Sequence, residues 1–107
     1  MTAVSKHYLR KKYRVVDVSS KKVGWDLTVK KIGSRDEIHV EVKGVSGSQP
    51  KVLLTRNEMK AAIGNPAWTL AVVTEALSKS PKVTIWSPES VKASSKPFAW
   101  EVNLVLP

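Results

Sequence analysis

The chain contains no cysteine. This absence excludes disulfide bonds, thiolate metal sites and a cysteine nucleophile, and it is typical of a reducing compartment. No apolar run approaches the roughly 18 residues of a membrane-spanning helix. Residues 1–14 are basic but lack the apolar segment of a secretory signal. We therefore expect a cytoplasmic protein without a membrane partner.

Acidic residues are also scarce, with 9 Asp and Glu against 18 Lys and Arg, which gives a formal net charge of +9. The excess lies in residues 1–60, which hold 14 basic and 6 acidic side chains, whereas residues 61–107 hold 4 and 3. Such a surface favours a polyanionic partner, nucleic acid before an anionic membrane, and we expect DNA. The alternative is a surface that only keeps the protein soluble.

The length of 107 residues, with 42% hydrophobic residues, is typical of one folded domain. We interpret residues 1–107 as a single domain. Its first predicted helix looks cut short, so we expect a piece or module of a longer protein. Other domains of that protein are then expected partners.

Periodicity and turn signals predict an α+β fold, a mixed sheet flanked by helices. A first helix is expected over 3–12, with Thr2 as its N-cap and with Val4, Tyr8 and Leu9 facing inward. A capping box over 55–58 begins a second helix that runs to about Ile63. Strands are expected at residues 13–18, 25–32, 36–43, 51–54, 67–74, 83–86 and 98–105.

The most regular pattern is a hairpin formed by 25–32 and 36–43, in which apolar and polar residues alternate. The Gly-Ser pair at 33–34 predicts a two-residue turn. The numbers of opposed residues then add to 67, which places Leu27 opposite Val40 on an apolar face. A shift of one residue would place apolar side chains opposite polar ones and is disfavoured.

On the polar face of this hairpin, Asp26 lies opposite Glu41, and Lys43 follows two residues later. Two facing carboxylates repel and need a cation between them or a raised pKa. Mg²⁺ and Mn²⁺ prefer oxygen ligands, and a nearby lysine can orient water or offset charge on a phosphate. These residues predict metal-assisted phosphodiester hydrolysis. The alternative is a solvated ion-pair cluster with no chemical role.

The motifs GWDL at 24–27, VEVKG at 40–44 and LTRNE at 54–58 resemble the C-terminal domain of the NO VEIN family, which is placed in the PD-(D/E)XK nuclease-like superfamily. The resemblance covers roughly residues 3–105. It implies the core order α-β-β-β-α-β, here with added C-terminal strands. It also implies that Asp26 and Glu41 ligate Mg²⁺ or Mn²⁺, that the Val42 carbonyl adds a ligand, and that Lys43 assists the attacking water.

The resemblance implies a nuclease-like domain acting on DNA, within a defence or restriction system. Many superfamily members carry an acidic residue on the first helix, but residues 2–12 contain no Asp or Glu. This departure keeps an alternative open, a non-catalytic nucleic-acid-binding or scaffold module of the same fold. An enzyme and a binding module therefore both remain possible interpretations.

The basic side chains that precede the carboxylate pair in the sequence are the expected phosphate contacts. We expect the basic helix and the loop after the first strand to form a cradle around the metal site. The candidate nucleic-acid contacts are Lys6, Arg10, Lys11, Lys12, Arg14, Lys21 and Lys22.

Overall fold

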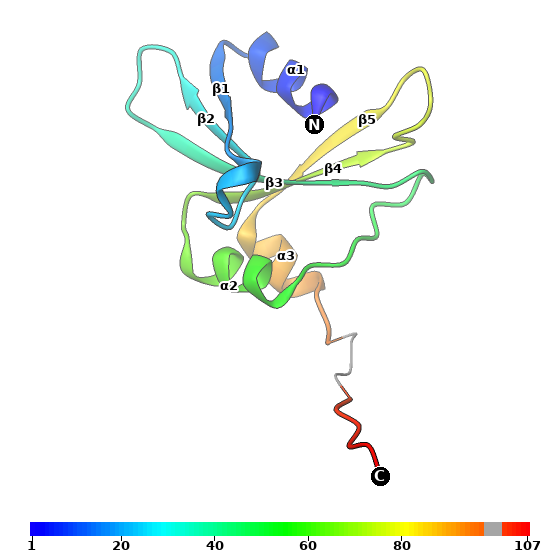
Figure 1. Ribbon diagram of the computed structural model, residues 1–107. Coiled ribbons are helices and arrows are strands. Elements are labelled where there is room, and N and C mark those ends of the chain that lie inside the picture. Colours follow the sequence, from blue (N-terminus) through cyan, green and yellow to red (C-terminus); the bar gives the residue numbers. More distant parts are fainter. Residues whose placement is uncertain (98–101) are drawn as a thin grey trace.

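A five-stranded mixed sheet, in the order β1-β2-β3-β4-β5, forms the centre of the fold (Figure 1). The computed structural model describes residues 1–97 and 102–107. β3 pairs with β4 in parallel, and the other neighbouring strands pair antiparallel. The strands are β1 (Tyr13–Asp17), β2 (Leu27–Lys31), β3 (Glu37–Gly44), β4 (Trp68–Thr74) and β5 (Lys82–Trp86).

The described residues also form three α-helices and one short 3-10 helix. The chain order α1-β1-β2-β3-α2-β4 is the predicted core order, and β5 and α3 follow it. The predicted α+β class with a mixed sheet is therefore confirmed. The helices are α1 (Thr2–Arg10), η1 (Ser19–Lys21), α2 (Arg56–Gly64) and α3 (Pro88–Ser94).

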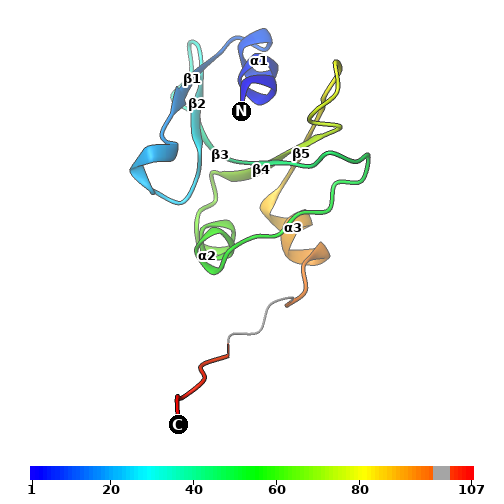
Figure 2. The ribbon, with the colours of Figure 1, turned by 45° about the vertical axis from the view of Figure 1, so that its right-hand side comes forward.

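The helices cover the sheet on both sides: α1 lies on one face, and α2 and α3 lie on the other (Figures 1 and 2). Each face has its own apolar cluster. Val4 and Tyr8 of α1 pack with Val40 on the first face. Trp68 packs with Ala62 of α2 on the second face, together with Val91 of α3. Because β4 contributes to both clusters, it is buried on both sides, as its continuous apolar sequence predicts.

The register of the β2–β3 hairpin is the predicted one. Leu27 pairs with Val40 and Val29 pairs with Ile38, so the paired numbers add to 67. The predicted two-residue turn is wrong, because the paired strands end at Lys30 and Glu37 and a longer connection joins them. The hydrophobic face therefore fixes the register without help from a tight turn.

The helix starts are partly as expected. The capping box of α2 is confirmed, since the Thr55 side chain accepts from the Glu58 N–H and the Glu58 side chain accepts from the Thr55 N–H. In α1, however, Met1 rather than Thr2 is the N-cap, and Leu9 is exposed instead of facing inward. The burial of Val4 and Tyr8 is confirmed. These two residues lie one helical turn apart, and together they hold the short helix on the sheet.

Two predicted strands need correction. Residues 51–54 form no strand, although Val52 and Leu54 pack against the α2-side cluster, so their alternation reflects burial without sheet pairing. Of the strand expected over 98–105, residues 98–101 lie outside the described residues, and residues 102–105 form no strand and are exposed.

The helix α3 was not predicted, although its sequence carries the signal. Ser87 is its N-cap and accepts from the Ser90 N–H, and Pro88 occupies the first helical position. Serine followed by proline is a common helix start because proline has no N–H to satisfy there.

The two faces of the sheet give a matched test of the core. Val40 is fully buried, whereas Val16 is 54% exposed on β1. We expect Val40→Ala to lower the free energy of unfolding by about 2 kcal/mol, because it leaves a cavity in the α1-side cluster. Val16→Ala should cost less than about 0.5 kcal/mol. Urea unfolding measures both, and equal losses would contradict the assigned faces.

Candidate functional site

The candidate site lies on the sheet face that α2 and α3 cover. Along β3, Ile38, Val40 and Val42 belong to the α1-side cluster. Because side chains alternate along a strand, Glu41 and Lys43 point to the opposite face. The structure thus brings these two residues together with Asp26 on one face, as the hairpin pattern predicts.

Asp26 lies directly before β2 and continues its pairing with β3. Its backbone N–H donates to the Val40 carbonyl at 2.9 Å, and its carboxylate oxygen Oδ2 accepts from the Val42 N–H at 2.9 Å. A carboxylate thus takes the place of a backbone partner where β2 begins. The N–H and C=O of one strand residue point to the same side, so the Val42 carbonyl also lies on the Asp26 side of β3.

Glu41 is the most buried ionisable side chain of the site, with 5% exposure. Burial raises the pKa of its carboxyl to about 9, and a hydrogen bond with Asp26 and the charges of Asp26 and Glu58 add to the effect. Lys43 acts in the opposite direction. A carboxyl with this pKa carries a proton at neutral pH, and a neutral Glu41 does not repel the neighbouring Asp26 carboxylate.

Lys43 pairs with Glu58, the same acid that completes the capping box of α2. Its Nζ donates to both carboxylate oxygens of Glu58, at 2.9 and 3.0 Å. One oxygen of Glu58 also accepts from the Thr55 N–H at 2.8 Å. Burial alone would raise the pKa of Glu58, but the hydrogen bond from Thr55 and the ion pair with Lys43 lower it. The start of α2 is thereby fastened to β3.

Sequence reasoning therefore missed Glu58 as a member of this cluster. The capping box explained the residue fully, so no unexplained feature remained to suggest a second contact. One signal was available. A helix that connects two parallel neighbouring strands packs on one face of the sheet. The polar side chains of β3 all lie on one face, so a connecting helix on that face would contact them. The first turn of α2 was therefore a candidate neighbour of Lys43.

A second polar group borders the site around His39. The rings of His39 and Trp25 stack with centroids 3.8 Å apart and an interplanar angle of 3°. One ring nitrogen of His39 lies 2.8 Å from Glu37, and the other lies 2.8 Å from the side-chain amide of Asn65, which follows α2. Both ring nitrogens are engaged, so His39 fastens the end of α2 to the sheet. It shares the face of Glu41, two residues further along β3.

The donor set fits one hard divalent cation. Asp26 and Glu41 offer carboxylate oxygens within hydrogen-bonding reach of each other, and the Val42 carbonyl lies on the same side. A cation would relieve the crowding that keeps Glu41 protonated. The fit is to two carboxylates only, because residues 1–97 and 102–107 contain no group of three or more His, Asp or Glu side chains that could hold a metal.

The basic residues divide between the two faces, so the expected single cradle is wrong. Lys6, Arg10 and Lys11 belong to α1 and its end, across the sheet from Glu41 (Figures 1 and 2). The loop with Lys21 and Lys22 leads to Gly24, where an added Cβ would lie 3.5 Å from Ala61 of α2. Arg14 pairs with Lys30 and shares its face. Lys12 lies in the turn between α1 and β1.

Residues 1–86 match the family model described as protein NO VEIN, C-terminal, and the chain belongs to this family. No curated protein and no solved structure matches the chain. Within the described residues, no helix is long and apolar enough to cross a membrane.

The raised pKa of Glu41 predicts how stability changes with pH. The folded state keeps a proton on this carboxyl between its usual pKa of 4.5 and about 9, whereas the unfolded state does not. The stability contribution is therefore complete below pH 4.5 and is lost as the pH rises toward 9. Thermal unfolding between pH 5 and 9 should show a decline of several kcal/mol in the free energy of unfolding of the wild type, because each pH unit in this window costs about 1.4 kcal/mol, and a flatter profile in Glu41→Gln. The exposed control Glu89→Gln should follow the wild type, and an unchanged slope in Glu41→Gln would contradict a raised pKa of Glu41.

The two roles of Glu58 can be separated. Gln also serves in a capping box, so Glu58→Gln should keep the helix start and lose the ion pair with Lys43. Thr55→Ala should do the reverse and cost about 1 kcal/mol. We expect faster acylation of the Lys43 amine in Glu58→Gln than in Thr55→Ala, measured by mass spectrometry of the modified peptide. Equal labelling in both variants and the wild type would show that Glu58 does not hold Lys43.

Proposed function

We propose that this domain is a metal-dependent nuclease of the PD-(D/E)XK type that hydrolyses phosphodiester bonds in DNA. The observation that carries the proposal is the meeting of Asp26, Glu41 and Lys43 at one point on the α2-side face. Two acids and an amine there are the groups that metal-assisted hydrolysis needs. The core order of helices and strands and the NO VEIN family membership support it.

Asp26 and Glu41 would hold Mg²⁺ or Mn²⁺, with the Val42 carbonyl as a further ligand. The cation, when bound, supplies charge to polarise the scissile phosphate and acidify a water molecule. The Asp26 carboxylate accepts a hydrogen bond from the Val42 N–H, which fixes it against β3. Asp26 would therefore present its carboxylate to the cation in a defined orientation. Glu41 would have to give up its proton to act as a ligand, so metal binding at this site would be coupled to its deprotonation.

Lys43 supplies the positive charge that faces the phosphate. The Lys43 side chain is 24% exposed and the Glu58 side chain is 18% exposed, so the ion pair is neither fully buried nor free in solvent. A phosphate at this point competes with Glu58 for Lys43 as a hydrogen-bond donor. Glu58 would then keep Lys43 in place before the substrate arrives.

Several cations lie on the same side as this site and would hold the flanking phosphates. Arg14 and Lys30 are cross-strand neighbours. They lie on the same face of the sheet as His39, which is the face of the candidate site. Lys21 and Lys22 lie in the loop that packs beside α2. Phosphate contacts of this kind position the duplex or strand without reading its sequence.

One observation favours the second candidate, a non-catalytic nucleic-acid-binding or scaffold module. Each polar group of the site already has a partner within the protein: Asp26 accepts from Val42, Lys43 donates to Glu58, and Glu41 hydrogen-bonds with Asp26. Such a network holds α2 on the sheet without any substrate. This candidate differs from the first in binding DNA without cutting it.

The deciding experiment incubates plasmid and single-stranded DNA with Mg²⁺ or Mn²⁺. We expect the wild type to cut, and we expect Asp26→Ala and Lys43→Ala to lose at least about 100-fold in rate, the loss typical of a removed catalytic group. Glu89→Gln serves as the exposed control. Absence of cutting by the wild type, or equal cutting by all variants, excludes the nuclease and leaves the binding module. Added Mn²⁺ should also raise the melting temperature of the wild type but not of Asp26→Ala.

A further inference from the structure

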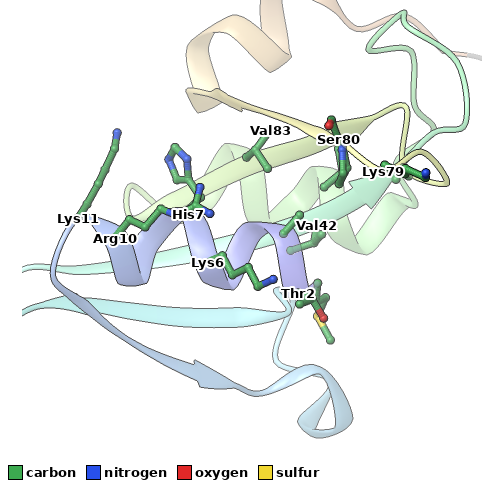
Figure 3. Close-up of a pocket in the computed structure, with 15 residues that line it drawn as sticks. Thr2, Lys6, His7, Arg10, Lys11, Val42, Lys79, Ser80 and Val83 are labelled. Carbon is green, nitrogen blue, oxygen red and sulfur yellow. The ribbon is translucent and has the colours of Figure 1, made fainter.

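A groove lies on the α1 face of the sheet, away from the candidate site (Figure 3). It has a volume of about 840 Å³ and runs between α1 and the turn that joins β4 to β5. Strand residues form its floor, among them Val42, Val73 and Val83. α1 packs on β1, β4 and β5, and the groove follows the side of the helix that faces the β4–β5 turn.

The walls of the groove carry positive charge on both sides. Lys6, Arg10 and Lys11 project from α1 and its end, and Lys79 projects from the β4–β5 turn (Figure 3). None of the lining residues, all of which the structure describes, is an Asp or Glu. Lys6 and Arg10 are four residues apart, so they lie one helical turn apart on the same side of α1. Their charges therefore form a row along the groove.

His7 also lines the groove, and its pKa is affected by the positive charges there. Burial lowers the pKa of its imidazole, and the charges of Lys11 and Arg10 lower it further. A neutral ring between cations adds contact surface to the groove without repelling them. The α1 sequence contains no acidic residue that could offset this charge.

We propose that this groove is a second nucleic-acid-binding surface, which holds the phosphate backbone of a segment other than the one at the carboxylate site. The proposal rests on the nucleic-acid partner of the proposed function. Val42 shows the separation directly, since its side chain lines the groove while its neighbours Glu41 and Lys43 point through the other face. One short segment therefore cannot occupy both places.

The shape of the groove favours a nucleic acid over a membrane. Its cations come from α1 and from the β4–β5 turn, on two sides of a recessed floor. A polymer strand can enter such a recess, whereas the surface of a bilayer cannot follow it. Binding led by phosphates releases counterions, so affinity should fall steeply with salt. Sequence preference is not expected, because the groove offers cations and aliphatic side chains rather than groups arranged to read base edges.

The test measures fluorescence anisotropy of labelled DNA, single-stranded and duplex, of about 20 nucleotides, in EDTA so that no cutting occurs. The groove variant is Lys6→Glu with Arg10→Glu. The matched control is Lys51→Glu with Lys96→Glu, which makes the same change in net charge at exposed residues outside the groove. Circular dichroism checks that each variant folds.

We expect the groove variant to lose at least about tenfold in affinity and to show a salt slope shallower by about 2, because two phosphate contacts are lost. The control should lose about threefold or less through net charge alone. Equal losses in both variants, or no DNA binding by the wild type together with binding to anionic vesicles, would overturn the proposal.

The outcome is separate from that of the proposed function. Asp26→Ala should keep the full affinity of the groove, because its change lies on the other face. Cutting by the wild type with unchanged binding by the groove variant would reject the groove and leave the nuclease. Groove-dependent binding without any cutting would reject the nuclease and leave the groove.

Discussion

The pairing of β3 with neighbours on both sides is the constraint on which the rest of the structure depends. β3 runs antiparallel to β2 and parallel to β4, so it cannot slip without breaking both ladders. Its alternation then sends Val40 and Val42 to the α1 side and Glu41 and Lys43 to the α2 side. The parallel neighbour also requires a crossover connection, and this connection contains α2, which supplies Glu58. One strand therefore decides both the position and the partners of the site.

The polar cluster that results contains one charged ion pair, Lys43 with Glu58, and one protonated acid, Glu41. Lys43 lies closest to Glu58, which keeps its charge, while Glu41 is left with Asp26 and remains protonated. Such an arrangement is stable without a metal, yet it holds a carboxyl that a cation could deprotonate. Geometry alone is therefore consistent with either a resting catalytic site or a structural network, and the two differ in what happens when Mg²⁺ or Mn²⁺ competes for Glu41.

The sequence was sufficient to predict the parts of the fold that depend on neighbouring residues. The register of Leu27 with Val40 and the capping box at Thr55 follow from local patterns, and both are confirmed. The contact between Lys43 and Glu58 was not predictable in the same way, because it joins two elements through the packing of a helix on a sheet. The same limit explains residues 51–54, whose alternation reflects packing against α2-side residues without a strand partner.

Net charge could not reveal that the cations lie on two faces. In the sequence, the basic helix precedes Asp26 closely, but β1 and the loop with η1 lie between them, and α1 lies on the opposite face of the sheet. Basic residues on both faces meet at β1 and its neighbour β2, at the edge of the sheet. Arg14 and Lys30 share the site face, while the next residue of β2, Lys31, pairs with Tyr13 and turns to the α1 face. A polyanion that passes from one face to the other around the β1 edge would therefore meet cations on both sides of that edge.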